Sequence, residues 1–182
     1  MSQLSAFAAG TTLLLWFSRK PLRHPGTHGF YRFFAWEAIL ALLVMNHQFG
    51  SENPVLTYQL VSWTLMPLSI VLALLGLATL LIEGRASSRR ADHGLLGFER
   101  TTRLVTRGVF KYIRHPMYAS LLALTWGAYF EDPSWFGVAL AAIASGLLFL
   151  VARADERECT AYFGQAYVDY MSRTRMFVPF IF

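Results

Sequence analysis

Five long apolar runs constrain the fold of this 182-residue chain more than any other feature. A helix that crosses a bilayer needs about 20 residues to span about 30 Å of hydrocarbon. The runs therefore predict membrane-spanning helices, of which the first and fourth are short for a perpendicular crossing. They lie near residues 3–18, 29–49, 59–82, 116–130 and 133–152. We expect one all-α integral membrane domain over residues 1–182, with five transmembrane helices and a cytoplasmic tail at 153–182.

The positions of the 16 Lys and Arg residues predict the orientation of these helices. Four lie at or after the first run, eight lie between the third and fourth runs, and four lie in the tail. The connections "GSENPVLTY" and "EDPS" contain none. Because cytoplasmic connections carry the excess of basic residues, we expect an outside N-terminus and a cytoplasmic C-terminus. The basic charge then faces anionic lipid headgroups, and nucleic acid is not an expected partner.

A short polar segment precedes the fourth run, in the stretch "YIRHPMYAS" at residues 112–120. Proline is favoured at the first position of a helix, so Pro116 is expected to begin the span. The free backbone amides at that end, next to Arg114 and His115, attract an anion. The alternative is that Arg114 reaches lipid headgroups and His115 caps the helix. A second Arg-His-Pro at 23–25 is followed by glycines, which indicates a loop with cations that reach the interface.

The tail combines acidic and aromatic side chains. Asp155, Glu156 and Glu158 follow the last run, and on one continuous helix positions 156, 159, 163, 167 and 170 would share a stripe. Carboxylates beside aromatic rings suit a cationic ligand. The alternative is an amphipathic helix that lies on the membrane with interfacial tyrosines.

The second run and the histidines give weaker signals. Arg32 is expected to reach the interface, whereas Glu37 lies deeper and should face the bundle interior with a partner or be protonated. The single cysteine, Cys159, excludes an internal disulfide. No metal site is expected, because the only histidines four residues apart, His24 and His28, lie in a loop that contains Pro and Gly.

The blocks "LVTRGVFKYIRHPMYAS" and "DERECTAYFGQAYVDYMSRTRMFVPFI" resemble the isoprenylcysteine carboxyl methyltransferase family and its relatives, the phospholipid N-methyltransferases. The shared pattern is Arg-His-Pro-x-Tyr, an acidic pair, Phe-Gly-x-x-Tyr-x-x-Tyr and a late proline. This resemblance implies an integral membrane enzyme that uses S-adenosylmethionine. Its cofactor pocket would be cytoplasmic and formed by the loop before the fourth span, the ends of the helical hairpin and a C-terminal amphipathic helix.

The resemblance also implies which residues bind the cofactor. The family's acidic pair, usually Glu-Glu, reads Asp155-Glu156 here, and which carboxylate binds the cofactor stays open. The cofactor's carboxylate suits the amide end at Pro116, and its ammonium and sulfonium suit the acidic and aromatic tail. The other expected pocket residues are Leu104, Val105, Phe110, His115, Pro116, Met117 and Tyr118.

Methyl transfer is an in-line displacement, so the enzyme chiefly aligns the acceptor with the sulfonium in a dry pocket. The favoured acceptor is a lipophilic, isoprenylcysteine-like carboxylate that enters from the bilayer, oriented by Arg153 or Arg173 as catalytic residues. The alternative is a phospholipid amine, which needs His115 or an acidic residue to take its proton. An NADPH-dependent membrane reductase and a non-enzymatic membrane scaffold are less favoured.

Overall fold

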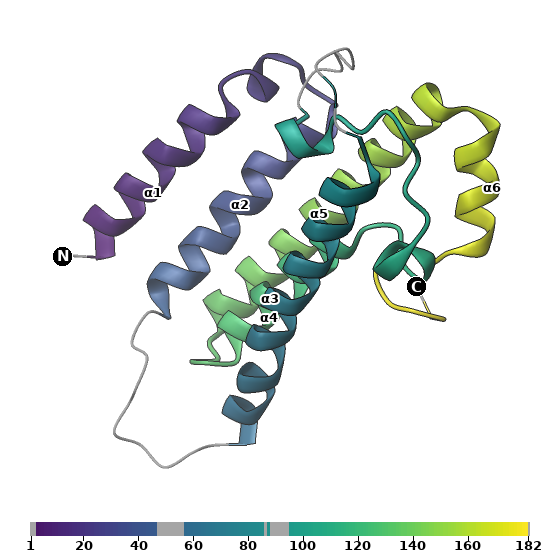
Figure 1. The fold of residues 1–182 in the computed structure, drawn as a ribbon. Helices are drawn as coiled ribbons and strands as arrows, with labels where there is room; N and C mark the ends of the chain where they lie inside the picture. The colour runs from purple at the N-terminus through teal and green to yellow at the C-terminus, as the bar shows by residue number, and fades with distance from the viewer. Residues whose placement is uncertain (1–2, 47–56, 86, 88–94, 182) are drawn as a thin grey trace.

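The computed structural model describes residues 3–46, 57–85, 87 and 95–181, and this part of the chain is helical (Figure 1). The α-helices are α1 (Gln3–Ser18), α2 (His28–Met45), α3 (Thr57–Glu83), α4 (Pro116–Tyr129), α5 (Trp135–Phe163) and α6 (Gln165–Arg173). Short 3-10 turns lie at η1 (Pro21–Arg23), η2 (Gly97–Glu99) and η3 (Gly108–Lys111). The described residues contain no named strand, only one isolated bridge between Ile113 and Arg175. The expected all-α class is confirmed.

Helices α1 to α5 form an up-and-down bundle in which α2 packs on α5 and α3 packs on α4 (Figure 1). The α2–α5 interface buries Ala35 and Ala38 against Ala144 and Leu148. Small side chains let two helix backbones approach closely, which is typical of packing between helices in a bilayer. On the other side of α2, Thr11 of α1 donates a hydrogen bond to Glu37 at 2.9 Å, so the expected partner of this carboxylate is present.

Among the described residues, three helices, α2, α3 and α5, are long and apolar enough to cross a membrane. On α3, Leu60, Trp63, Ile70 and Leu74 are each more than half exposed, as lipid-facing residues would be. The other expected spans form helices of only 16 residues (α1) and 14 residues (α4), below the length of about 20 that a crossing needs. Five crossings therefore remain a prediction. The expected end of the second span, 47–49, lies outside the described residues.

The last long helix does not end at residue 152. Helix α5 begins at its cap Ser134, whose Oγ accepts a hydrogen bond from the Gly137 amide at 3.0 Å, and continues to Phe163. Gly164 then adopts φ +61°, a conformation that residues with a Cβ rarely adopt, and α6 starts in a new direction. The expected single stripe from 156 to 170 was therefore wrong, because it is divided between α5 and α6.

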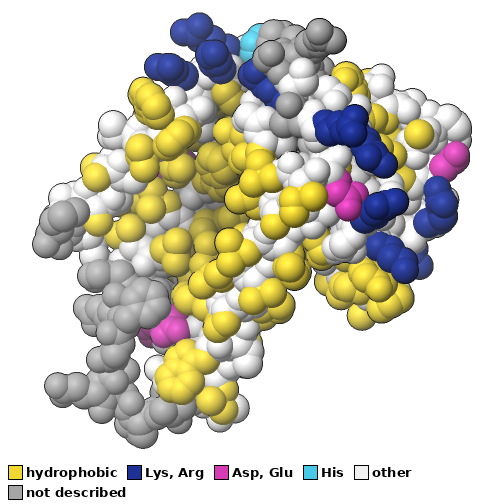
Figure 2. All heavy atoms as spheres, viewed as in Figure 1, with side chains coloured by type: hydrophobic (Ala, Val, Ile, Leu, Met, Phe, Trp, Pro, Cys, Tyr) yellow, Lys and Arg dark blue, Asp and Glu magenta, His cyan; other side chains and the backbone are white. Residues whose placement is uncertain are grey.

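Lys and Arg side chains on the face seen in Figure 2 gather toward one end of the molecule and over α6. This is the end where α1 joins α2 and where α3 leads to α4 (Figure 1). The α4–α5 turn at 130–134, which contains no basic residue, lies at the opposite end. The bundle therefore has one basic end, and the pocket described below opens there.

Candidate active site

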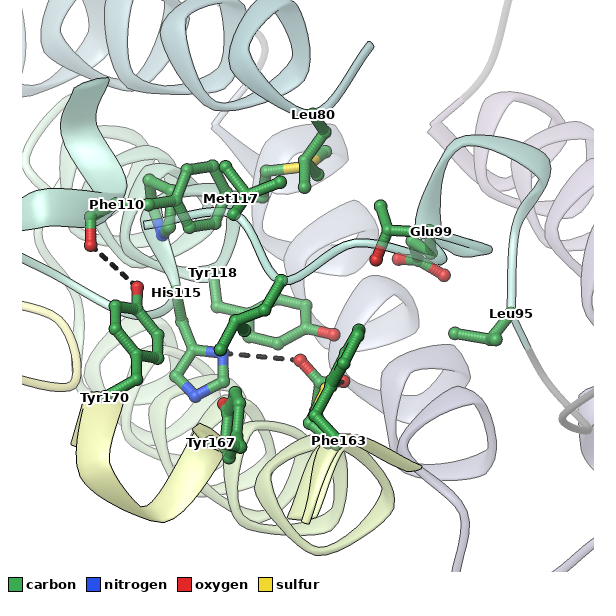
Figure 3. Close-up of a pocket in the computed structure, with 16 residues that line it drawn as sticks. Leu80, Leu95, Glu99, Phe110, His115, Met117, Tyr118, Phe163, Tyr167 and Tyr170 are labelled. Carbon is green, nitrogen blue, oxygen red and sulfur yellow. Dashed lines mark hydrogen bonds and ion pairs between the residues drawn. The ribbon is translucent and has the colours of Figure 1, made fainter. Parts of the chain in front are cut away.

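A pocket lies where α3 ends, α4 begins and α5 meets α6 (Figure 3). The space between these elements is about 700 Å³, part of which is open solvent. The lining is mainly apolar and aromatic, with a few polar groups that converge on it. The lining residues are Leu80, Leu95, Glu99, Thr101, Leu104, Val105, Phe110, His115, Pro116, Met117, Tyr118, Asp155, Cys159, Phe163, Tyr167 and Tyr170.

The segment before α4 is held in place by the chain's C-terminal segment. The amides of Arg114 and His115 donate to the carbonyls of Arg175 and Met176, at 2.8 and 3.2 Å. The Arg114 guanidinium donates to Glu156 Oε1 at 2.8 Å and to the Thr174 carbonyl at 2.5 Å. Arg114 is therefore engaged within the protein and does not line the pocket, contrary to the expectation that it faces an anion.

His115 lies at the centre of the polar lining and is only 4% exposed. Its Nδ1 is 3.4 Å from Asp155 Oδ2 and its Nε2 is 3.5 Å from Glu156 Oε1. Burial alone would lower the pKa of His115, but Asp155 and Glu156 outweigh it and raise that pKa above 6.5. His115 occupies the N-cap position of α4, as the alternative expected, but its imidazole makes no capping hydrogen bond to the helix.

Aromatic side chains form one side of the pocket. Tyr167 and Tyr170 come from α6 and Phe163 from the end of α5, and the Tyr170 hydroxyl donates to the Phe110 carbonyl at 2.7 Å. Burial raises the pKa of both tyrosines, so their hydroxyls stay protonated at neutral pH. Neutral rings beside the Asp155 carboxylate make this side suitable for a cation.

The structure brings most of the expected cofactor residues together. Asp155 lines the pocket, whereas Glu156 is buried behind it in ion pairs with Arg114 and Arg153. The expected catalytic arginines are not in the lining: the Arg153 side chain is 60% exposed, and Arg173 is exposed on α6. The other expected residues that line it are Leu104, Val105, Phe110, His115, Pro116, Met117 and Tyr118.

Sequence reasoning missed Glu99. This residue of η2 lines the pocket and accepts hydrogen bonds from Arg32 Nη1 at 2.5 Å and from the Leu96 amide at 2.7 Å. The nearby His28 binds Glu158 through Nδ1 at 2.6 Å. Burial tends to raise the pKa of Glu99, but the charge of Arg32 and the contact with His28 outweigh it and lower that pKa.

Arg32 was expected at the membrane interface, and this was wrong because Glu99 holds it in the interior, where it is 3% exposed. A buried guanidinium requires an anionic partner. No feature of the sequence indicated this need, because none showed that Arg32 is buried.

These features describe a helical membrane protein with a pocket that is lined by two carboxylates, an imidazole and aromatic rings. The model of the phospholipid methyltransferase family matches residues 65–166, from α3 to the first turn of α6. The match covers more than half of the chain, so the protein belongs to this family and is a membrane methyltransferase. Neither the comparison with curated proteins nor that with solved structures found a match.

Proposed function

We propose that this protein transfers a methyl group from S-adenosylmethionine to a lipophilic acceptor that reaches the pocket from the bilayer. The observation that carries the proposal is the meeting of Asp155, the aromatic side and the first turn of α4 in one pocket. S-adenosylmethionine has a carboxylate at one position and an ammonium and a sulfonium at others. The pocket offers a complementary group to each.

The cationic groups of the cofactor suit the side formed by Asp155, Phe163 and Tyr167, through charge and cation-π attraction. Its carboxylate suits the start of α4, where Pro116 occupies the first turn and no side chain caps the helix. The backbone amides of that turn carry partial positive charge. When bound, the cofactor would supply the methyl group, and the protein would hold it and exclude water.

The orientation we propose has the pocket on the cytoplasmic side and the N-terminus outside. The basic end of the bundle supports it, because cytoplasmic connections carry the excess of Lys and Arg (Figure 2). A water-soluble cofactor would then enter from the cytosol. The acceptor would enter beside α3 and α4, whose Leu80 and Met117 form part of the apolar lining.

For the acceptor, the lining supports an amine better than the isoprenylcysteine-like carboxylate that the resemblance favours. A carboxylate acceptor needs a cationic partner. No Lys or Arg is among the described residues that line the pocket, and the His115 imidazole in the lining already lies between Asp155 and Glu156. The titratable charged groups there are Glu99, Asp155 and His115. In amine transfer, the nitrogen lone pair forms the C–N bond while the C–S pair returns to sulfur. The N–H proton passes to a basic group of the pocket, for which the carboxylates of Glu99 and Asp155 are the candidates, because the raised pKa of His115 favours its protonated form.

Thermal unfolding of the full chain in detergent tests the proposal. S-adenosylhomocysteine should raise the melting temperature and NADPH should not. Protection by NADPH alone would indicate the reductase, and protection by neither would overturn both enzyme interpretations. The matched control is Glu131→Gln, at the opposite end of the bundle, where Glu131 accepts a hydrogen bond from Ser62. This control should keep the protection.

Transfer of labelled methyl groups tests the acceptor class. The protein is supplied with phosphatidylethanolamine vesicles or with a prenylcysteine analogue that carries a free carboxylate. We expect label in the amine lipid. Label only in the prenylcysteine ester would restore the carboxylate acceptor and leave the use of S-adenosylmethionine intact.

A further inference from the structure

The pocket contains two carboxylates that come from different elements and have different neighbours. Asp155, on α5, lies next to His115 and the aromatic side, and we call this the Asp155 end. Glu99, on η2, lies with Leu95 on the side of the pocket away from Phe110 and Tyr170 (Figure 3), and we call this the Glu99 end. The proposed function places the cationic groups of S-adenosylmethionine at Asp155. The second carboxylate is therefore available for another ligand.

Glu99 is held rigidly and still has capacity to bind. Oε1 accepts from Arg32 and Oε2 from the Leu96 amide, while His28 Nε2 lies 3.6 Å from Oε2. A carboxylate has about four lone-pair positions, so these contacts do not saturate it. Its side chain is 15% exposed and lines the pocket. A group fixed in this way is oriented before the ligand arrives, which lowers the entropic cost of binding.

The surroundings of Glu99 favour a lipid amine. The charged groups that contact Glu99 are Arg32, which pairs with its Oε1, and His28, which lies near its Oε2 and pairs with Glu158. The apolar residues Leu80 and Leu95 line the same pocket and suit the hydrocarbon part of a lipid. An N–H donor beside Glu99 would meet a carboxylate acceptor, and these apolar side chains would lie near the donor's hydrocarbon part.

We propose that Glu99 is the residue that determines acceptor specificity: its carboxylate accepts a hydrogen bond from the acceptor's amine and orients the nitrogen toward the methyl group. Arg32 is the positioning residue that holds Glu99 in this orientation. The inference rests on the proposed function and assigns the acceptor side of the same pocket to a residue outside both motif blocks.

The test uses the full chain in lipid nanodiscs, with S-adenosylhomocysteine binding and methyl transfer measured on the same preparations. Glu99→Gln should keep the thermal protection by S-adenosylhomocysteine. It should lower kcat/KM for phosphatidylethanolamine about tenfold or more, mainly through KM, because a hydrogen bond to a charged group is lost. Glu99→Asp keeps the charge and should restore part of the loss. Arg32→Gln should reduce turnover of the amine lipid in the same way, and Arg32→Lys should restore part of it.

Glu131→Gln removes a carboxylate from the opposite end of the bundle and should leave both measurements unchanged. The inference is overturned if Glu99→Gln methylates phosphatidylethanolamine with wild-type kinetics. It is also overturned if the variant loses S-adenosylhomocysteine binding, because Glu99 would then act on the donor or on the fold of the pocket. Failure of the proposed function differs from both outcomes, since the wild-type chain itself would not bind S-adenosylhomocysteine.

Discussion

The two ends of the pocket are built in different ways. At the Asp155 end, the polar groups come from the start of α4 and the end of α5, close to one another in a helical hairpin and inside the motif blocks. At the Glu99 end, the carboxylate comes from η2 and its partner Arg32 lies 67 residues earlier, on α2. A local motif is therefore sufficient to bring together the polar groups of the Asp155 end, but not those of the Glu99 end. The Glu99 end needs the assembled bundle.

The largest expected effect concerns the acidic pair itself. Glu156→Gln should lower the free energy of unfolding by about 3 kcal/mol, because it removes the carboxylate that pairs with the half-buried Arg114. The remaining folded protein should still bind S-adenosylhomocysteine, since Glu156 lies behind the pocket lining. Denaturant unfolding with and without the ligand measures both effects. Unchanged stability together with lost binding would make Glu156 the cofactor ligand.

Asp155→Asn should affect ligand binding rather than the fold. We expect the affinity for S-adenosylhomocysteine to fall by about ten- to a hundredfold, the equivalent of one hydrogen bond to a charged group. Isothermal titration on the folded variant measures this change, with Glu131→Gln as the control. Wild-type affinity would mean that the Asp155 end does not bind the donor.

The two ends should respond to pH in opposite directions. The raised pKa of His115 means that its contribution to stability is complete below 6.5 and is lost as pH rises through the raised value. The lowered pKa of Glu99 means that its contribution is present above 4.5 and is lost as pH falls through the lowered value.

Melting temperatures across this pH range check the assignment. His115→Asn should flatten the alkaline side of the profile, and Glu99→Gln should flatten the acidic side. If either variant flattens the other side instead, the ionisation we assign to that residue is wrong.

The smallest effect is expected for Arg153→Ala. Its ion pair with Glu156 involves a largely exposed side chain, and such pairs contribute about 0–1 kcal/mol. Stability and methyl transfer should therefore both stay close to wild type. A specific loss of transfer to the prenylcysteine carboxylate, with stability unchanged, would restore the orienting role that the sequence suggested for this arginine.

Much of the fold follows from local signals in the sequence. The positions of the helices follow from apolar runs, and their starts follow from Pro116 and from the caps Thr27 and Ser134. Helix α5 continues past the predicted end of the span at 152, because polar residues end an apolar run without ending a helix. Gly164 was the actual stop signal, through its positive φ.

The candidate site was predictable where a contact joins neighbouring elements or belongs to a motif. His115 and Asp155 could be placed together because the short α4–α5 turn makes the two helices antiparallel, so the second half of α5 lies near the start of α4. Glu99 could not be placed, because its loop has no apolar period and its partner is distant in sequence. The sequence also did not predict that Asp155 would line the pocket and that Glu156 would not. Adjacent residues on a helix point about 100° apart, and only packing decides which one faces the pocket.

Apolar runs and local signals in the sequence specify a helical membrane protein, the ends of most helices and the residue types of the candidate site. These properties depend on hydrophobicity, local backbone preference and the short range of a helical hairpin. The tertiary structure decided which carboxylates line the pocket and which arginines are engaged as structural ion pairs. The physical reason is that a buried charge needs a partner at hydrogen-bond distance, and a distant segment supplies that partner only once the bundle has assembled.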